Sequence, residues 1–131
     1  MSVALVFITH EGIASHLVNI GEAILQKKNN NLACFEVAMD ASVENKLDDI
    51  DRQLEQLDTS EGLLVITDVY GSTPSNIAQT IADKYHADLL SGVNLPMIIR
   101  LLNYRDEDIA TLLKKALDGA KKGIQHNSYG R

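Results

Sequence analysis

The sequence predicts one α/β domain with an open, mostly parallel four-stranded sheet and helices on both faces. Short apolar runs alternate along the chain with segments of helical periodicity, which is the pattern of parallel strands joined by crossover helices. The length of 131 residues corresponds to a single domain over residues 1–131. The contents of 45% hydrophobic and 23% charged residues are ordinary for a globular chain with its own core.

The first half of the chain predicts two strands and two helices. The apolar run Val3–Thr9 predicts a buried strand that ends at His10. A helix follows over Ile13–Lys28, and its predicted core-facing stripe is Ile13, Leu17, Ile20 and Ile24. Leu32–Val37 predicts the second strand. Val43–Leu57 predicts the second helix, with Ser42 as its N-cap and with a core-facing set of Leu47, Ile50, Leu54 and Leu57.

The second half repeats the alternation. Gly62–Thr67 predicts the third strand, which ends at Asp68. The next helix has Pro74 in its first turn, where proline is tolerated, and extends to Tyr85. The remaining predicted elements are a strand over Ala87–Val93, a short helix over Met97–Leu102, a helix opened by Asp106 or Asp108 and reaching Ala120, and a candidate short final strand over Gly123–His126.

Composition argues against several classes of protein. The net charge of -6 is unlike the basic stripe of a nucleic-acid-binding protein. The single cysteine, Cys34, cannot form an internal disulfide, and we expect it to pack in the core of a protein from a reducing compartment. We see no secretion signal and no apolar stretch near the roughly 20 residues that a membrane span needs. We therefore expect a cytoplasmic protein that does not insert into a membrane.

His10 and Asp68 end the first and third strands. With the strand order 2-1-3-4, which we assume from the fold class, the chain reverses direction between these two strands. Ligands of open α/β sheets bind at such a switch point, beyond the carboxyl ends of the strands. A lone histidine at a strand end is usually an ordinary loop residue, but this order makes His10 and Asp68 neighbours.

The two residues together predict phosphoryl transfer. A carboxylate that accepts a hydrogen bond from one ring nitrogen fixes the tautomer and leaves the other nitrogen free to attack. The loop after Asp68 adds Gly71, Ser72 and Thr73 as candidate phosphate-binding residues at a helix N-terminus. A phosphohistidine at His10 follows as the predicted intermediate. We expect no cofactor, since no metal-ligand spacing, dinucleotide motif or Walker A loop occurs.

These residues resemble a known family, the EIIA component of the mannose/fructose class of the bacterial phosphoenolpyruvate:sugar phosphotransferase system. The resemblance spans essentially the whole chain as one EIIA domain. It rests on Thr9-His10, on Asp68 with Gly71-Ser72-Thr73-Pro74, and on the run Gly92 to Met97 (GVNLPM). It implies that His10 accepts phosphate from the phosphocarrier HPr, that Asp68 orients it, and that an EIIB histidine receives the group. It also implies a homodimer in which the terminal strand pairs antiparallel with the other subunit's sheet.

The loop departs from the family pattern. Sugar-transporting members commonly have Asp-Thr/Ser-x-Gly-Gly-Ser-Pro, whereas this chain has Val69 without a hydroxyl, Ser72 for the second glycine and Thr73 for serine. Glu11 also places a negative charge beside the acceptor. The variant loop and the absence of a linker to an EIIB domain resemble stand-alone members. The alternative is therefore a regulatory EIIA whose phosphorylation state controls partner binding rather than sugar uptake.

Two further alternatives fit the residues less well. A receiver domain would carry a phosphoaspartate at Asp68, but it needs an acidic pair after the first strand to hold Mg²⁺, and this chain has Thr9-His10-Glu11 there. The related phosphocarrier of dihydroxyacetone kinases has a loop without proline, and Pro74 argues against it.

Overall fold

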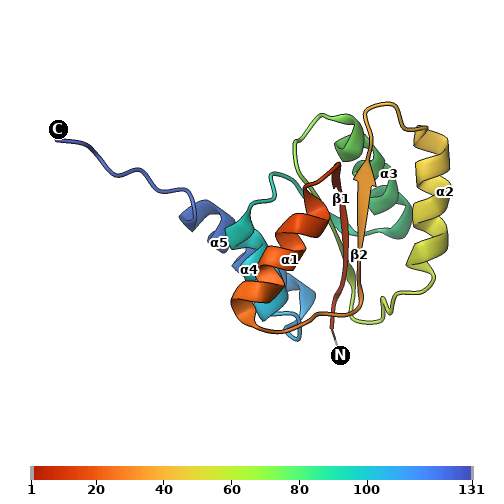
Figure 1. Cartoon of the computed structure of the whole chain (residues 1–131). Coiled ribbons are helices and arrows are strands. Elements are labelled where there is room, and N and C mark those ends of the chain that lie inside the picture. The colour runs from red at the N-terminus through yellow and green to blue at the C-terminus, as the bar shows by residue number, and fades with distance from the viewer. Residues whose placement is uncertain (1, 131) are drawn as a thin grey trace.

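Four parallel strands form one sheet in the order β2-β1-β3-β4 in the computed structural model, which describes residues 2–130 (Figure 1). This is the predicted order, and it places β1 beside β3 at the centre. The strands are β1 (Ala4–His10), β2 (Leu32–Val37), β3 (Leu63–Thr67) and β4 (Asp88–Leu90). The helices are α1 (Ala14–Leu25), α2 (Val43–Leu54), α3 (Thr73–Tyr85), α4 (Leu95–Asn103) and α5 (Ile109–Lys122).

The sheet is buried on both faces, because alternate residues of each strand enter different cores. Leu5 and Phe7 of β1 face α1, α4 and α5, whereas Val6 and Ile8 face α2 and α3. All four side chains are fully buried. Figure 1 shows the two groups of helices on opposite sides of the strands. The predicted α/β class with helices on both faces is therefore confirmed.

The predicted core-facing stripe of the first helix is wrong. Ile13, Ile20 and Ile24 are 37%, 45% and 53% exposed, and Leu17 is only partly buried. The buried residues of α1 are instead Ala14, Val18 and Gly21. Small side chains allow a close approach: a Cβ on Gly21 would lie 2.7 Å from Cγ2 of Ile98 in α4. Close packing of α1 on α4 therefore decides which face is buried.

Most other boundaries agree with the prediction within a few residues. Ser42 caps α2 and Asp108 caps α5 through hydrogen bonds from Asn45 N–H and Thr111 N–H. The predicted fourth strand is longer than observed, because only Asp88–Leu90 pairs with regular strand geometry.

The candidate final strand is not formed in this single chain. Gly123 is the C-cap of α5, and residues 124–130 carry no regular structure. Figure 1 shows this tail extending away from the helices and the sheet. A strand needs a neighbouring strand to accept its backbone hydrogen bonds, and the tail has none there. The expected exchange of this segment in a dimer stays a prediction.

Candidate functional site

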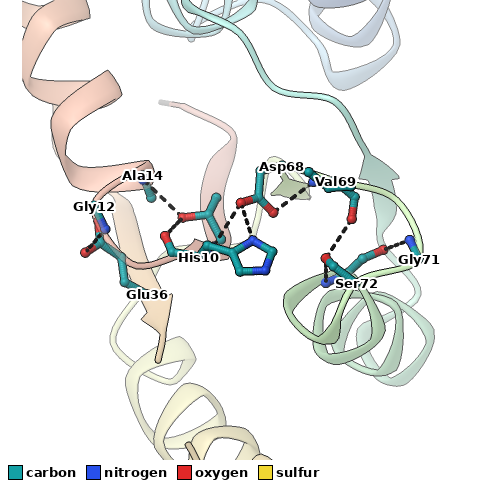
Figure 2. A network of polar contacts seen from close by, with 10 residues as sticks. His10, Gly12, Ala14, Glu36, Asp68, Val69, Gly71 and Ser72 are labelled. Atoms are coloured by element: carbon teal, nitrogen blue, oxygen red, sulfur yellow. Dashed lines mark hydrogen bonds and ion pairs between the residues drawn. The ribbon is translucent and has the colours of Figure 1, made fainter. Parts of the chain in front are cut away.

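His10 and Asp68 come together at the carboxyl ends of the two central strands (Figure 2). The Nδ1 atom of His10 lies 2.8 Å from Oδ2 of Asp68. The main-chain N–H of His10 donates to the same oxygen over 3.0 Å. The pair is thus joined through both the ring and the backbone, as the assumed strand order predicts.

The Asp68 carboxylate is mostly buried, and both of its oxygens accept hydrogen bonds. Its side chain is 11% exposed, and its second oxygen accepts the N–H of Val69 over 2.9 Å. Burial raises the pKa of Asp68, but the hydrogen bonds from His10 and Val69 together outweigh it and leave the pKa below its ordinary value. Asp68 is therefore charged at neutral pH and accepts a hydrogen bond from Nδ1–H. The tautomer this favours leaves the lone pair of Nε2 free.

The backbone of Asp68 is held from the other side by the segment after β4. The N–H of Gly92 donates to the carbonyl of Asp68 over 2.7 Å, and Val93 N–H donates to that of Thr67 over 3.2 Å. Gly92 has a φ of +81°, which favours glycine. Asn94 then caps α4 by accepting the N–H of Met97. The run that begins at Gly92 thus fixes both the site and the next helix.

The three candidate phosphate-binding residues in the loop after Asp68 have different structural roles. Ser72 caps α3: its Oγ accepts the N–H of Ser75 and donates to the carbonyl of Val69 over 2.7 Å. Gly71 N–H donates to Ser75 Oγ over 3.2 Å. Thr73 is exposed and lines a cavity together with His10. In this arrangement Thr73 is the residue of the three that lies at the His10 cavity, while Ser72 and Gly71 stabilise the loop.

The cavity at His10 is small. Its volume is about 100 Å³, and its lining comprises His10, Val37, Ala38, Met39, Thr73 and Pro74. The His10 side chain is 36% exposed. Four larger hollows within residues 2–130 are lined by other residues than His10 and Asp68. Space of this size suits a small group such as a phosphoryl group rather than a whole metabolite.

The sequence predicts no role for two polar side chains that support the His10 segment, those of Thr9 and Glu36. Thr9 is fully buried, and its hydroxyl donates to the carbonyl of His10 over 2.9 Å. Glu36, at the end of β2, accepts the N–H groups of Gly12 and Ser15. A carboxylate among the apolar residues of a strand was the available signal for Glu36, but its partners depend on the pairing of β1 with β2.

Other titratable residues take no part in the His10–Asp68 contact. Cys34 packs against the core, and burial, followed by the charges of Glu36 and Glu22, raises the pKa of its thiol to about 11, so the thiol is protonated at neutral pH. Glu11, His16, His86 and His126 are exposed. Within residues 2–130, no group of three or more potential metal-ligating side chains gathers, and no helix is long and apolar enough to cross a membrane.

Comparison with known proteins identifies the family to which this chain belongs. The family model of EIIA-man, described as the fructose IIA component of the phosphotransferase system (PTS), matches residues 4–117. The chain therefore belongs to this family, the EIIA components of the mannose class of the sugar phosphotransferase system.

Individual relatives agree with this assignment. The mannose-specific EIIAB component of Escherichia coli strain K12 is 30% identical over 128 residues, which cover 95% of this chain and 39% of the relative. The chain thus spans about two fifths of the length of that curated relative. The fructose-specific EIIA component of Bacillus subtilis strain 168 is 26% identical over 76% of this chain and 67% of its own length. The mannose/sorbose specific IIA subunit from Enterococcus faecalis has the same fold, with a TM-score of 0.84 at 17% identity over 100% of this chain and 98% of its own.

Proposed function

We propose that this chain is a phosphocarrier that accepts a phosphoryl group from HPr on Nε2 of His10 and passes it to an EIIB partner. The observation that carries the proposal is the 2.8 Å contact between His10 Nδ1 and Asp68 Oδ2 at the switch point of the sheet. Membership of the EIIA-man family supports it independently.

The transfer requires a nucleophilic nitrogen and a counter-charge. In the proposed step the lone pair of Nε2 forms a bond to phosphorus, and the bond from phosphorus to the donor histidine breaks with its electron pair returning to the donor ring. Nδ1 keeps its proton, so the His10 ring becomes more positive as the new bond forms. The Asp68 carboxylate faces that nitrogen and offsets the charge. The same step in reverse, toward a second protein, releases the group.

The surroundings of the cavity favour a protein as donor and acceptor. Apolar side chains from three loops are exposed near the carboxyl ends of β1, β2 and β3: Ile13, Met39, Val69 and Tyr70. Met39 lines the cavity itself and is 93% exposed. Apolar groups around a small polar centre are typical of protein–protein contacts. We expect these side chains to be covered when a partner presents its phosphohistidine.

Incubation of the chain with enzyme I, HPr and phosphoenolpyruvate tests the proposal. Wild type is expected to acquire one acid-labile, alkali-stable phosphate, and His10→Ala is expected to acquire none. His16→Ala is the matched control, because His16 is an exposed histidine of α1 and should leave the reaction unchanged. Failure of wild type to take phosphate, or persistence of the phosphate in His10→Ala, rejects the proposal.

The same site supports a regulatory role as a second candidate. Val69 and Tyr70 are 60% and 80% exposed beside Asp68, so a phosphate on His10 would change the charge of a partly apolar surface. Pull-downs with phosphorylated and unphosphorylated wild type test this role, with His10→Ala as the control. A partner that binds in only one state supports it, and identical partners in every state reject it.

A further inference from the structure

The loop that carries His10 ends in a helix without an ordinary cap. The N-cap of α1 is Ile13, whose side chain makes no capping hydrogen bond. The first N–H groups of a helix have no partner within the helix, and each needs one from elsewhere. Here the needed acceptors come from the ends of β1 and β2.

Glu36 accepts two of the four backbone N–H groups between Gly12 and Ser15. Its Oε1 accepts the N–H of Gly12 over 3.0 Å (Figure 2). Its Oε2 accepts the N–H of Ser15 over 3.0 Å and the hydroxyl of Ser15 over 2.7 Å. The Glu36 carboxylate thus binds Gly12, before the first residue of α1, and Ser15, within the first turn of that helix.

The remaining N–H groups of this turn are also paired. Thr9 is the register partner of Glu36, and its Oγ1 accepts the N–H of Ala14 over 3.1 Å. The N–H of Ile13 donates to the carbonyl of His10 over 3.3 Å. Every backbone N–H from Gly12 to Ser15 therefore has an acceptor, which defines one conformation of the loop.

Glu36 is ionised in this arrangement. The hydroxyl and N–H of Ser15 and the N–H of Gly12 hold its pKa below the ordinary range of a glutamate, against the effect of burial. A negative charge at the N-terminus of α1 is also stabilised by the helix dipole. Glu36 therefore acts as an anionic cap at neutral pH, and it comes from the neighbouring strand β2.

We propose that Glu36 is a positioning residue for phosphoryl transfer: it fixes the turn from His10 to Ser15 and thereby the direction of the His10 ring. This rests on the proposed function of His10. Asp68 restrains the ring and the N–H of His10, whereas the Glu36-held turn restrains its carbonyl through Ile13. Both restraints are needed to aim Nε2 at phosphorus, since small errors of direction slow such a step strongly.

Glu36→Gln is the sharpest variant. A glutamine has one acceptor oxygen and one NH₂ donor, so it cannot offer a separate oxygen to Gly12 N–H and to Ser15 N–H as Glu36 does. We expect kcat for transfer from phosphorylated HPr to fall about tenfold, with KM changed less than about twofold. Glu36→Asp keeps the charge on a shorter side chain and is expected to recover part of the rate.

Glu22→Gln is the matched control. Glu22 is a carboxylate of α1 that also accepts one backbone N–H, that of Asn29, at the far end of the helix. Both glutamine variants replace a charged acceptor of a backbone N–H by a neutral one, so both are expected to lower Tm. Only Glu36→Gln is expected to lower kcat.

A second readout does not depend on phosphate. The Nδ1 proton of His10, followed by NMR, is expected to exchange with water at least about tenfold faster in Glu36→Gln than in wild type or Glu22→Gln. Wild-type values of kcat and of proton exchange in Glu36→Gln would overturn the proposal. If wild type takes no phosphate, the proposed function fails, and the exchange rate still decides whether Glu36 positions His10.

Discussion

His10 and Asp68 are 58 residues apart in the sequence, yet Nδ1 of one lies 2.8 Å from Oδ2 of the other. The contact exists because β1 and β3 are neighbours and parallel, so their carboxyl ends meet at one edge of the sheet. The contact assigns different roles to the two ring nitrogens. Nδ1 is engaged by the carboxylate, and Nε2 is the nitrogen proposed to carry phosphate.

Replacing Asp68 by asparagine tests the counter-charge. Asp68→Asn removes the carboxylate that faces Nδ1 and permits the wrong tautomer, so transfer to His10 is expected to slow by about 100-fold or more. Single-turnover transfer from phosphorylated HPr measures it. Asp118→Asn is the control and should keep the wild-type rate, because this α5 carboxylate pairs with Arg100 and Lys122 rather than with His10. An unchanged rate in Asp68→Asn removes this residue from the mechanism.

Asp68 also makes stability depend on pH. Its folded-state pKa is lowered, so its contribution is fully present above its unfolded pKa of about 4 and is lost as pH falls through the folded value. Urea unfolding from pH 7 to pH 3 is expected to show a steeper loss of stability for wild type than for Asp68→Asn. Parallel curves for the two proteins would contradict this account of the carboxylate.

Substitution of Ser72 is expected to lower stability, whereas substitution of Thr73 is expected to slow phosphoryl transfer. Ser72→Ala removes the cap of α3 and should lower the free energy of unfolding by about 1 kcal/mol. Thr73→Ala should leave stability nearly unchanged and slow the transfer, because Thr73 lines the His10 cavity. Ser42→Ala removes the cap of α2 and serves as the control that loses stability without losing transfer. Equal effects of Ser72→Ala and Thr73→Ala on the transfer rate would contradict the different roles assigned to these two residues.

Gly92 is expected to tolerate no side chain without cost. An added Cβ would meet no atom within 4 Å, so the penalty of Gly92→Ala comes from its φ of +81° alone. We expect a loss of about 1–2 kcal/mol in the free energy of unfolding. Gly130→Ala, at a φ of +63°, should cost little because Gly130 lies in an exposed tail without regular structure, where no neighbouring element depends on its φ. Denaturant titration compares the two variants, and a fully stable Gly92→Ala would show that the turn relaxes.

The fold and the central pair could be predicted because they follow from strong patterns. Apolar runs marked the strands, and parallel strands bring residues such as His10 and Asp68 to the same edge. The buried face of α1 could not be predicted, because two stripes of that helix are apolar. Periodicity does not distinguish the large side chains of Ile20 and Ile24 from the small ones of Ala14 and Gly21, and close packing on α4 selects the latter.

The hydrogen bonds of Glu36 to the turn after His10 could not be predicted, for a different reason. Glu36 reaches Gly12 only because β2 pairs with β1 in a register that places Glu36 beside Thr9. Register depends on packing of both strands and is not visible in either segment alone. The sequence predicts Gly71, Ser72 and Thr73 together as candidate phosphate-binding residues, and only the three-dimensional arrangement separates Thr73 at the cavity from Ser72 in the cap.

The most direct measurement is the identity of the phosphorylated nitrogen. A chain labelled with ¹⁵N in its histidines, phosphorylated by enzyme I, HPr and phosphoenolpyruvate, can be examined by ¹⁵N and ³¹P NMR. Our account predicts one phosphoryl group, bonded to Nε2 of His10, with Nδ1 still engaged by Asp68. Phosphate on Nδ1 of His10, or on any other residue, would contradict it.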